Sequence, residues 1–193
     1  SHLQDKPANG VPHPLKDICP FTTMGLFNRS LTVTNRRNIA ASLAKLIGVR
    51  EKVPESFDGI PLLNNQKSWF FGYEKSRKPE DIDTLWEMFS QAISFADTPN
   101  ADPADFFFSY DAASNVRNVG WNLTMGLYWL RPWFYPTLDS QSQYYIQKVL
   151  NIKIIKKGAK GRCSGHNYQT VALALKKAFT QPNYPVHSFP ELS

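Results

Sequence analysis

The segment Val116-Arg117-Asn118-Val119-Gly120 decides how this sequence folds, because it separates two stretches whose apolar residues recur at helical spacing. The first stretch runs from Asp102-Pro103 to about Asn115, and the second runs from Trp121 to about Leu130. A tight connection between two helices needs a left-handed backbone, which Gly120 supplies and which Asn118 tolerates best among the other residues. The sequence therefore predicts a mainly α domain that contains a helix-hairpin-helix.

Such a hairpin is suited to holding a DNA phosphate. Backbone amides at the start of the second helix point outward, where they can bind a phosphate without reading the base. Arg117 would add positive charge to that contact, and we expect Asn118, Gly120 and Asn122 to take part in it. The alternative is a plain tight turn between two packed helices.

Other helices are predicted from caps and apolar spacing. One runs from about Asn35 to Ile47 after Thr32 or Thr34, with Arg36, Arg37 and Lys45 facing outward. A second begins at Lys78-Pro79-Glu80-Asp81, and its core stripe is Ile82, Leu85, Trp86, Phe89, Ile93 and Ala96. A third opens at Asp139-Ser140, with Ser140 and Gln143 as a capping box, and a fourth covers about Asn167 to Phe179. Residues 150–155 can be read as a short strand or a helix end, so the fold has room for a small peripheral sheet.

The ends of the chain are rich in proline. We expect a flexible arm over residues 1–16, a DNA-recognition domain over residues 17–180 and a linker over residues 181–193. The opening Ser1-His2 is typical of a cleaved tag, which predicts a domain cut from a longer protein.

Composition excludes several classes of protein. The 193 residues are 42% hydrophobic, and no apolar run or secretory signal predicts a membrane or exported protein, so we expect a cytoplasmic domain. Cys19 and Cys163 form no metal-binding pair, and Gly158 to Arg162 lacks the order of a P-loop. We therefore predict no metal and no cofactor in this chain. The net charge of +6 favours phosphate-rich partners.

Three basic clusters are the predicted DNA contacts besides the hairpin. They comprise Arg29, Arg36 and Arg37; Lys75, Arg77 and Lys78; and Lys160 and Arg162. Aromatic residues beside them are candidates for a pocket that holds an extruded base, although packing explains them equally well: Trp69, Tyr73, Trp121, Trp133 and Tyr135.

The hairpin followed by Tyr135-Pro136-Thr137-Leu138-Asp139 resembles the helix-hairpin-helix DNA glycosylases. The resemblance implies that Asp139 occupies the place of their catalytic aspartate. Asn122 stands where the bifunctional enzymes carry a lysine, and the chain has neither an iron-sulfur cysteine set nor an identifiable second acid. The alternative, which we favour, is that Asp139 caps a helix and that no residue is catalytic.

A wider resemblance covers about Lys16 to Phe179. Its motifs are Pro20-Phe21-Thr22, Gly25 to Arg29, Pro54 to Pro61, Ser68 to Phe71 and Gly120 to Trp129. Together they are similar to the region that precedes the AAA+ GTPase motor in McrB-type restriction proteins. The resemblance implies that this region chooses double-stranded DNA, methylated DNA included, that GTP and Mg²⁺ bind the missing motor, and that an McrC-type nuclease subunit cleaves.

These observations favour a DNA-binding specificity domain of an McrBC-like system, which is not itself an enzyme. A glycosylase-like enzyme that uses Asp139 and a protein-interaction adaptor are the alternatives.

Overall fold

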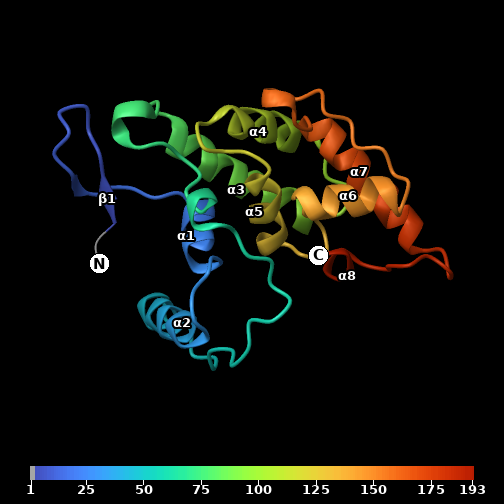
Figure 1. Ribbon diagram of the computed structural model, residues 1–193, viewed down its shortest axis with the longest axis horizontal. Coiled ribbons are helices and arrows are strands. Elements are labelled where there is room, and N and C mark those ends of the chain that lie inside the picture. Colours follow the sequence, from blue (N-terminus) through green and yellow to red (C-terminus); the bar gives the residue numbers. More distant parts are fainter. Residues whose placement is uncertain (1–2) are drawn as a thin grey trace.

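The computed structural model describes residues 3–193 and has the mainly α fold predicted above, with one small sheet (Figure 1). The α-helices span Pro20–Phe27 (α1), Val33–Ile47 (α2), Asp81–Asp97 (α3), Ala104–Asn115 (α4), Asn122–Leu130 (α5), Ser140–Lys148 (α6), Gly165–Phe179 (α7) and Phe189–Leu192 (α8). Strands Gln4–Asp5 (β1) and His13–Pro14 (β2) pair in antiparallel fashion. Short 3₁₀ turns cover Asn65–Lys67 (η1), Glu74–Ser76 (η2) and Ala159–Gly161 (η3). Within the described chain, no helix has both the length and the apolar character needed to cross a membrane.

Helix ends follow the capping residues in the sequence. Thr32 Oγ1 accepts a hydrogen bond from the Asn35 amide at the start of α2, and Gly48 ends that helix with a φ of 76°. The capping box predicted at the start of α6, with Ser140 as the cap, is wrong. The N-cap residue is Asp139, one position earlier, and Gln143 donates its side-chain amide to the Leu138 carbonyl.

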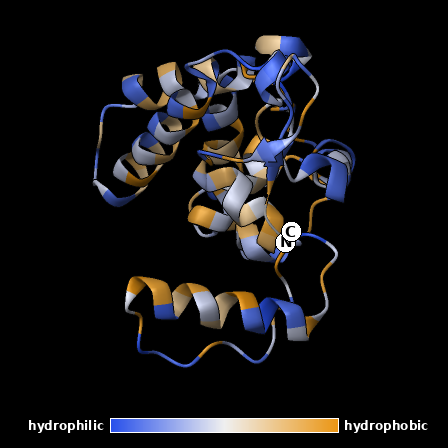
Figure 2. Ribbon diagram, turned by 90° about the vertical axis from the view of Figure 1, so that its left-hand side faces the viewer, coloured by the Kyte–Doolittle hydropathy of each residue, from blue (hydrophilic) through white to orange (hydrophobic). Residues whose placement is uncertain are grey.

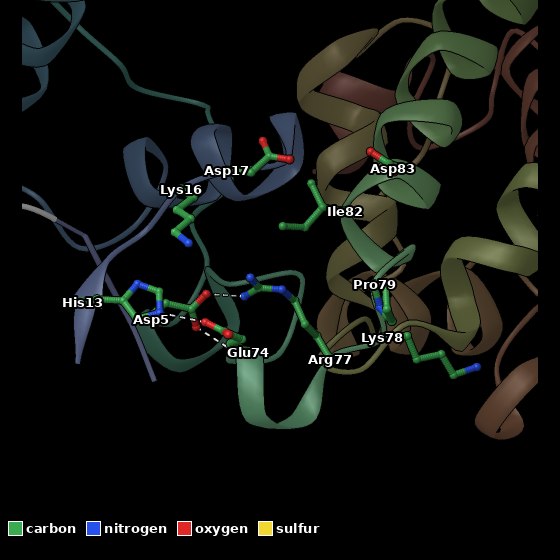
Figure 3. A pocket seen from close by; sticks show the side chains of 10 residues that line it. All are labelled: Asp5, His13, Lys16, Asp17, Glu74, Arg77, Lys78, Pro79, Ile82 and Asp83. Atoms are coloured by element: carbon green, nitrogen blue, oxygen red, sulfur yellow. Dashed lines mark hydrogen bonds and ion pairs between the residues drawn. The ribbon is translucent and has the colours of Figure 1, made fainter. Parts of the chain in front are cut away.

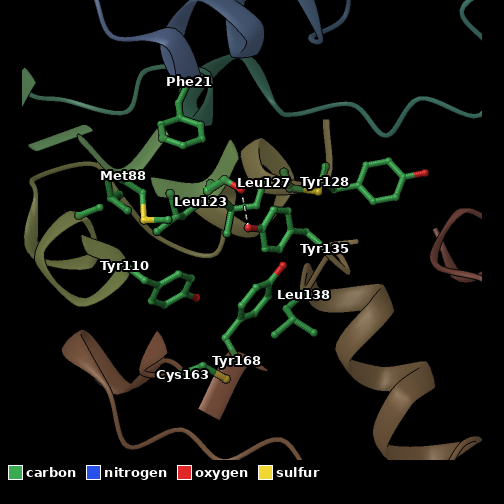
Figure 4. Packing of buried hydrophobic residues seen from close by; sticks show 14 of the residues in the cluster. Phe21, Met88, Tyr110, Leu123, Leu127, Tyr128, Tyr135, Leu138, Cys163 and Tyr168 are labelled. Atoms are coloured by element: carbon green, nitrogen blue, oxygen red, sulfur yellow. Dashed lines mark hydrogen bonds between the residues drawn. The ribbon is translucent and has the colours of Figure 1, made fainter. Parts of the chain in front are cut away.

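The core lies where α3 packs against α4, α4 against α7, and α1 against both α3 and α5. Its centre is a group of buried aromatic rings, in which Phe106 stacks on Tyr135 at 5.5 Å and Tyr110 on Tyr168 at 5.2 Å between centroids. Figure 4 shows Tyr110, Tyr135 and Tyr168 among the surrounding leucines. Tyr135 donates its hydroxyl to the Ala92 carbonyl at 2.7 Å, so the polar end of this buried ring is satisfied.

The stripe predicted for α3 is only partly correct. Ile82 and Leu85 are buried, but Trp86 is 46% exposed and Met88 is buried in its place. Residues 150–155 form neither a strand nor a helix end, and Ile154 is buried from an extended segment.

α2 projects from the helical body on two connecting segments, as Figure 1 and Figure 2 both show. Its apolar residues are largely uncovered, with Leu46 80% and Ile47 71% exposed. The prediction that Arg36 faces outward is wrong. Arg36 is buried because its guanidinium lies over the rings of Phe27 and Phe57 and donates to the Arg29 carbonyl at 3.1 Å.

Both chain ends differ from the predictions. Residues 3–16 form a hairpin rather than a flexible arm, because buried Asp5 accepts hydrogen bonds from the Glu74 amide and the Arg77 guanidinium. The predicted linker is packed onto the body, since Val186 and Phe189 are buried and the Phe189 ring meets Phe179 at 5.3 Å.

Candidate nucleic-acid interface

A pocket of about 360 Å³ lies between the connection from α4 to α5, residues 116–120, and the aromatic segment that follows η1. We call it the Trp69 pocket, and it is lined by Asn65, Gln66, Trp69, Phe71, Tyr73 and Asn118. Its volume falls within the range of small-ligand sites. None of these lining residues is charged, and two of the five aromatic residues predicted to surround a base, Trp69 and Tyr73, are among them.

The rings of the pocket come from alternate residues of one extended segment. Trp69 meets Phe71 edge to face at 5.4 Å and lies 6.0 Å from Tyr73, between centroids. Phe71 is buried, whereas Tyr73 is 39% exposed. Phe70 points the other way and stacks on Phe21 in the core, at 5.7 Å. The pocket therefore has a buried aromatic wall and an accessible aromatic residue.

Asn118 closes the pocket from the hairpin side. Its φ of 71° confirms the left-handed backbone expected at this position, and its Nδ2 donates to the Phe71 carbonyl at 2.8 Å. The same expectation for Gly120 is wrong, because the left-handed glycines of the described chain are elsewhere. The turn between α4 and α5 therefore contains one left-handed residue, Asn118.

Asn122 is a structural residue rather than a DNA contact. Its side chain is 5% exposed, and its Oδ1 accepts the Gly120 amide at 2.6 Å. Its Nδ2 donates to the Lys67 carbonyl at 3.0 Å. The Gly120 amide is thus engaged within the protein, which removes it from the amides predicted to hold phosphate.

The predicted contacts Lys160 and Arg162 bind the carboxyl end of α4. Lys160 Nζ donates to the Val116 carbonyl at 2.8 Å, and Arg162 donates to the Ser114 carbonyl at the same distance. Both cations complement the negative end of the helix dipole. Burial lowers the pKa of each side chain, although Lys160 as a whole stays exposed and Arg162 is half-buried.

Arg77 is also engaged. It pairs with Asp5, and its guanidinium lies 5.6 Å from the centroid of Phe71. Figure 3 shows this ion pair in a second pocket, between the N-terminal hairpin and the start of α3, together with a 2.7 Å contact between His13 Nε2 and Glu74. The Pro14 carbonyl and the Glu74 carboxylate raise the pKa of His13. These interactions hold the N-terminal β-hairpin against the helical body.

The remaining predicted cations differ in exposure. Arg117, Lys75, Lys78 and Arg37 are exposed, while Arg29 is half-buried. Arg117 adjoins Asn118 in sequence and lies against Gly72, where an added Cβ would be 3.2 Å from its Cδ. Sequence reasoning missed Lys6, whose Nζ lies 5.0 Å from the Tyr73 ring centroid. No local signal could have identified it, because the contact depends on the packing of the N-terminal hairpin.

Three predicted base-pocket residues lie elsewhere. Tyr135 is fully buried in the core, and Trp133 is 73% exposed beside Phe179 and Phe189. Trp121 is half-buried with Lys156 Nζ 5.5 Å from its ring centroid. These aromatic residues do not line the Trp69 pocket.

Asp139 has the geometry of a helix cap, as the favoured interpretation predicted. Oδ1 accepts the amides of Gln141 and Ser142 at 2.8 and 3.1 Å, and Oδ2 accepts the Ser142 hydroxyl at 2.8 Å. Both carboxylate oxygens therefore have a structural role.

The cysteines and the metal-ligating side chains give no reactive site in the part of the chain described. Cys19 and Cys163 are free and buried, and burial raises the pKa of each thiol to about 11, so the reactive thiolate is scarce at neutral pH. Residues 3–193 contain no cluster of His, Cys, Asp or Glu side chains arranged to hold a metal ion.

The chain belongs to a family described as a domain of unknown function (DUF8425), which it matches over residues 1–188. No curated protein and no solved structure matches it. The geometry of the Trp69 pocket and its surroundings is therefore the main basis for a functional proposal.

Proposed function

We propose that this chain is a DNA-recognition domain and that its Trp69 pocket accepts a base turned out of the double helix. The observation that carries the proposal is the pocket itself, in which half-buried Trp69, exposed Tyr73 and three carboxamide side chains meet with no charged lining residue. An extruded base stacks on aromatic rings and forms hydrogen bonds through its edge, and carboxamides are suited to that edge.

Cations near the pocket would hold the phosphate backbone. Arg117 and Lys75 are exposed, and Lys6 is exposed beside Tyr73. Lys75 is linked to Lys6 through a hydrogen bond from its amide to the Lys6 carbonyl at 3.1 Å. Phosphate contacts of this kind supply affinity, while the pocket supplies selectivity.

In the proposed biological setting, the domain selects DNA for an McrB-type restriction system in the cytoplasm. This part of the proposal rests on the sequence motifs from Pro20 to Trp129 that resemble such proteins. GTP and Mg²⁺ would bind the motor region of the full-length protein, and an McrC-type subunit would cut the DNA. The chain itself would bind without catalysing a reaction.

The test is fluorescence anisotropy with labelled duplexes, plain, methylated and hydroxymethylated, at two salt concentrations. We expect binding whose affinity falls steeply with salt, with a logarithmic slope of about −0.9 for each phosphate contact. Tyr73→Ala removes a stacking surface and should weaken binding to the preferred duplex by about tenfold. Trp133→Ala is the matched control, because Trp133 is an exposed aromatic residue outside the pocket.

Absence of binding to every duplex at low salt would contradict the proposal. Equal losses from Tyr73→Ala and Trp133→Ala would show that the pocket has no special part in binding.

A protein-interaction adaptor is the second candidate, and the uncovered side of α2 favours it. Ile39, Leu43, Leu46 and Ile47 are all more than one-third exposed there. An adaptor function would survive charge reversal at Arg117 and Lys75, whereas DNA binding would not. The double substitution Leu43→Ser and Leu46→Ser would abolish an adaptor function and leave DNA binding intact.

A further inference from the structure

Asn118 presents its side chain to the Trp69 pocket in one orientation. Its Nδ2 donates to the Phe71 carbonyl at 2.8 Å, so turning the carboxamide over would bring Oδ1 against that carbonyl oxygen. The left-handed backbone at Asn118 further limits the position of the side chain. Among residues 3–193, Oδ1 has no hydrogen-bond donor. Asn118 is exposed, and it thus offers the pocket an acceptor whose orientation is set by its own Nδ2 hydrogen bond.

The other two carboxamides of the pocket are not held in one orientation. Asn65 and Gln66 are exposed on η1, and their side chains can rotate to present either a donor or an acceptor. Trp69 and Tyr73 stack on any base, because every base has a π face. Asn118 is therefore the residue through which the pocket can distinguish one base from another.

We infer that the Trp69 pocket selects a base with an exocyclic amino group, such as cytosine or adenine. The inference rests on the proposed function and specifies its ligand. The amino group at the edge of these bases can donate to Asn118 Oδ1 while the ring stacks on the aromatic side chains. Thymine has an oxygen at the corresponding position and therefore offers no amino donor to Oδ1 there.

The experiment deletes the amino group from the ligand without adding a clash. Two labelled duplexes carry one unpaired base opposite an abasic site, and the base is either cytosine or 2-pyrimidinone, which has hydrogen in place of the amino group. Leaving the base unpaired makes the pairing cost of extrusion the same for both. We expect the full chain to bind the cytosine duplex about threefold to tenfold more tightly in anisotropy titrations, as one hydrogen bond provides.

Asn118→Gly removes Oδ1 while a glycine keeps the left-handed backbone, so it should bind both duplexes equally. Asn100→Gly is the matched control, because Asn100 is another left-handed asparagine, with a φ of 57°, that lies outside the pocket. It should keep the preference for cytosine. Circular dichroism verifies that both variants are folded.

The outcomes separate the two proposals. Salt-dependent binding of the unmodified chain with equal affinity for the two duplexes overturns the amino-group selectivity and leaves DNA recognition in place. No binding to either duplex at low salt overturns the proposed function as well. A preference that persists in folded Asn118→Gly overturns the assignment to Asn118. If that variant does not fold, the comparison of duplexes with the unmodified chain still decides the selectivity.

Discussion

Asn122 shows how one side chain can connect segments that are distant in sequence. It accepts the Gly120 amide and donates to the Lys67 carbonyl, which joins the hairpin to η1 across 55 residues. A third, longer contact reaches the Asn118 carbonyl at 3.4 Å. Both walls of the Trp69 pocket therefore depend on Asn122, although it does not line the pocket.

We predict that Asn122→Ala lowers the free energy of unfolding by about 1–3 kcal/mol, because it leaves the partly buried Gly120 amide and the Lys67 carbonyl without this partner. Urea unfolding followed by circular dichroism measures the change. Asn115→Ala is the control, since Asn115 is exposed and bonds only within α4. A loss no larger than that of the control would show that the connection through Asn122 contributes little stability.

At the scale of elements, buried Asp5 joins the N-terminal hairpin to the body through the Glu74 amide and the Arg77 guanidinium. Burial alone would raise the pKa of Asp5, but hydrogen bonds from the Glu74 amide, the Arg77 side chain and the Lys6 amide together hold it below its usual value. A lowered pKa means that folding favours the ionised carboxylate. The resulting stabilisation is complete above the unfolded pKa of 3.8 and is lost as the pH falls through the lower folded value.

We therefore predict that Asp5→Asn lowers the free energy of unfolding at pH 7 by about 3 kcal/mol, as expected for removing one partner of a buried ion pair. Below pH 4, the unmodified chain should lose stability more steeply than the variant, because only the former has this carboxylate to protonate. Urea unfolding at pH 7, 4 and 3 tests both points. Asp17→Asn, at an exposed residue of the same pocket, should change little. Parallel pH profiles for the unmodified chain and Asp5→Asn would contradict this account.

At the scale of the whole molecule, the final segment completes the core. Phe189 is 2% exposed, packs on Phe179 at 5.3 Å between centroids and lies near Lys176, whose Nζ is 5.8 Å from its ring centroid. Val186 is buried in the same segment. The body therefore extends almost to the last residue of the chain.

We predict that Phe189→Ala lowers the free energy of unfolding by about 3–4 kcal/mol, because it opens a cavity under α8. Thermal and urea unfolding measure it. Phe108→Ala provides a control of the same size, as Phe108 is 78% exposed on α4. Similar small effects from both substitutions would mean that residues 181–193 behave as the linker first expected.

The sequence by itself determined helices α2 to α7 and the left-handed turn at Asn118, because caps, apolar spacing and turn residues act over a few positions. It did not predict α1 or α8. Only the tertiary structure decided which predicted contacts already have a partner within the protein. Arg77 meets Asp5 across 72 residues and Lys160 meets the Val116 carbonyl across 44. A cation looks the same in sequence whether it faces solvent or a buried acceptor. Its availability is set by partners that folding brings together, and so is the meeting of Trp69, Tyr73 and Asn118 in one pocket.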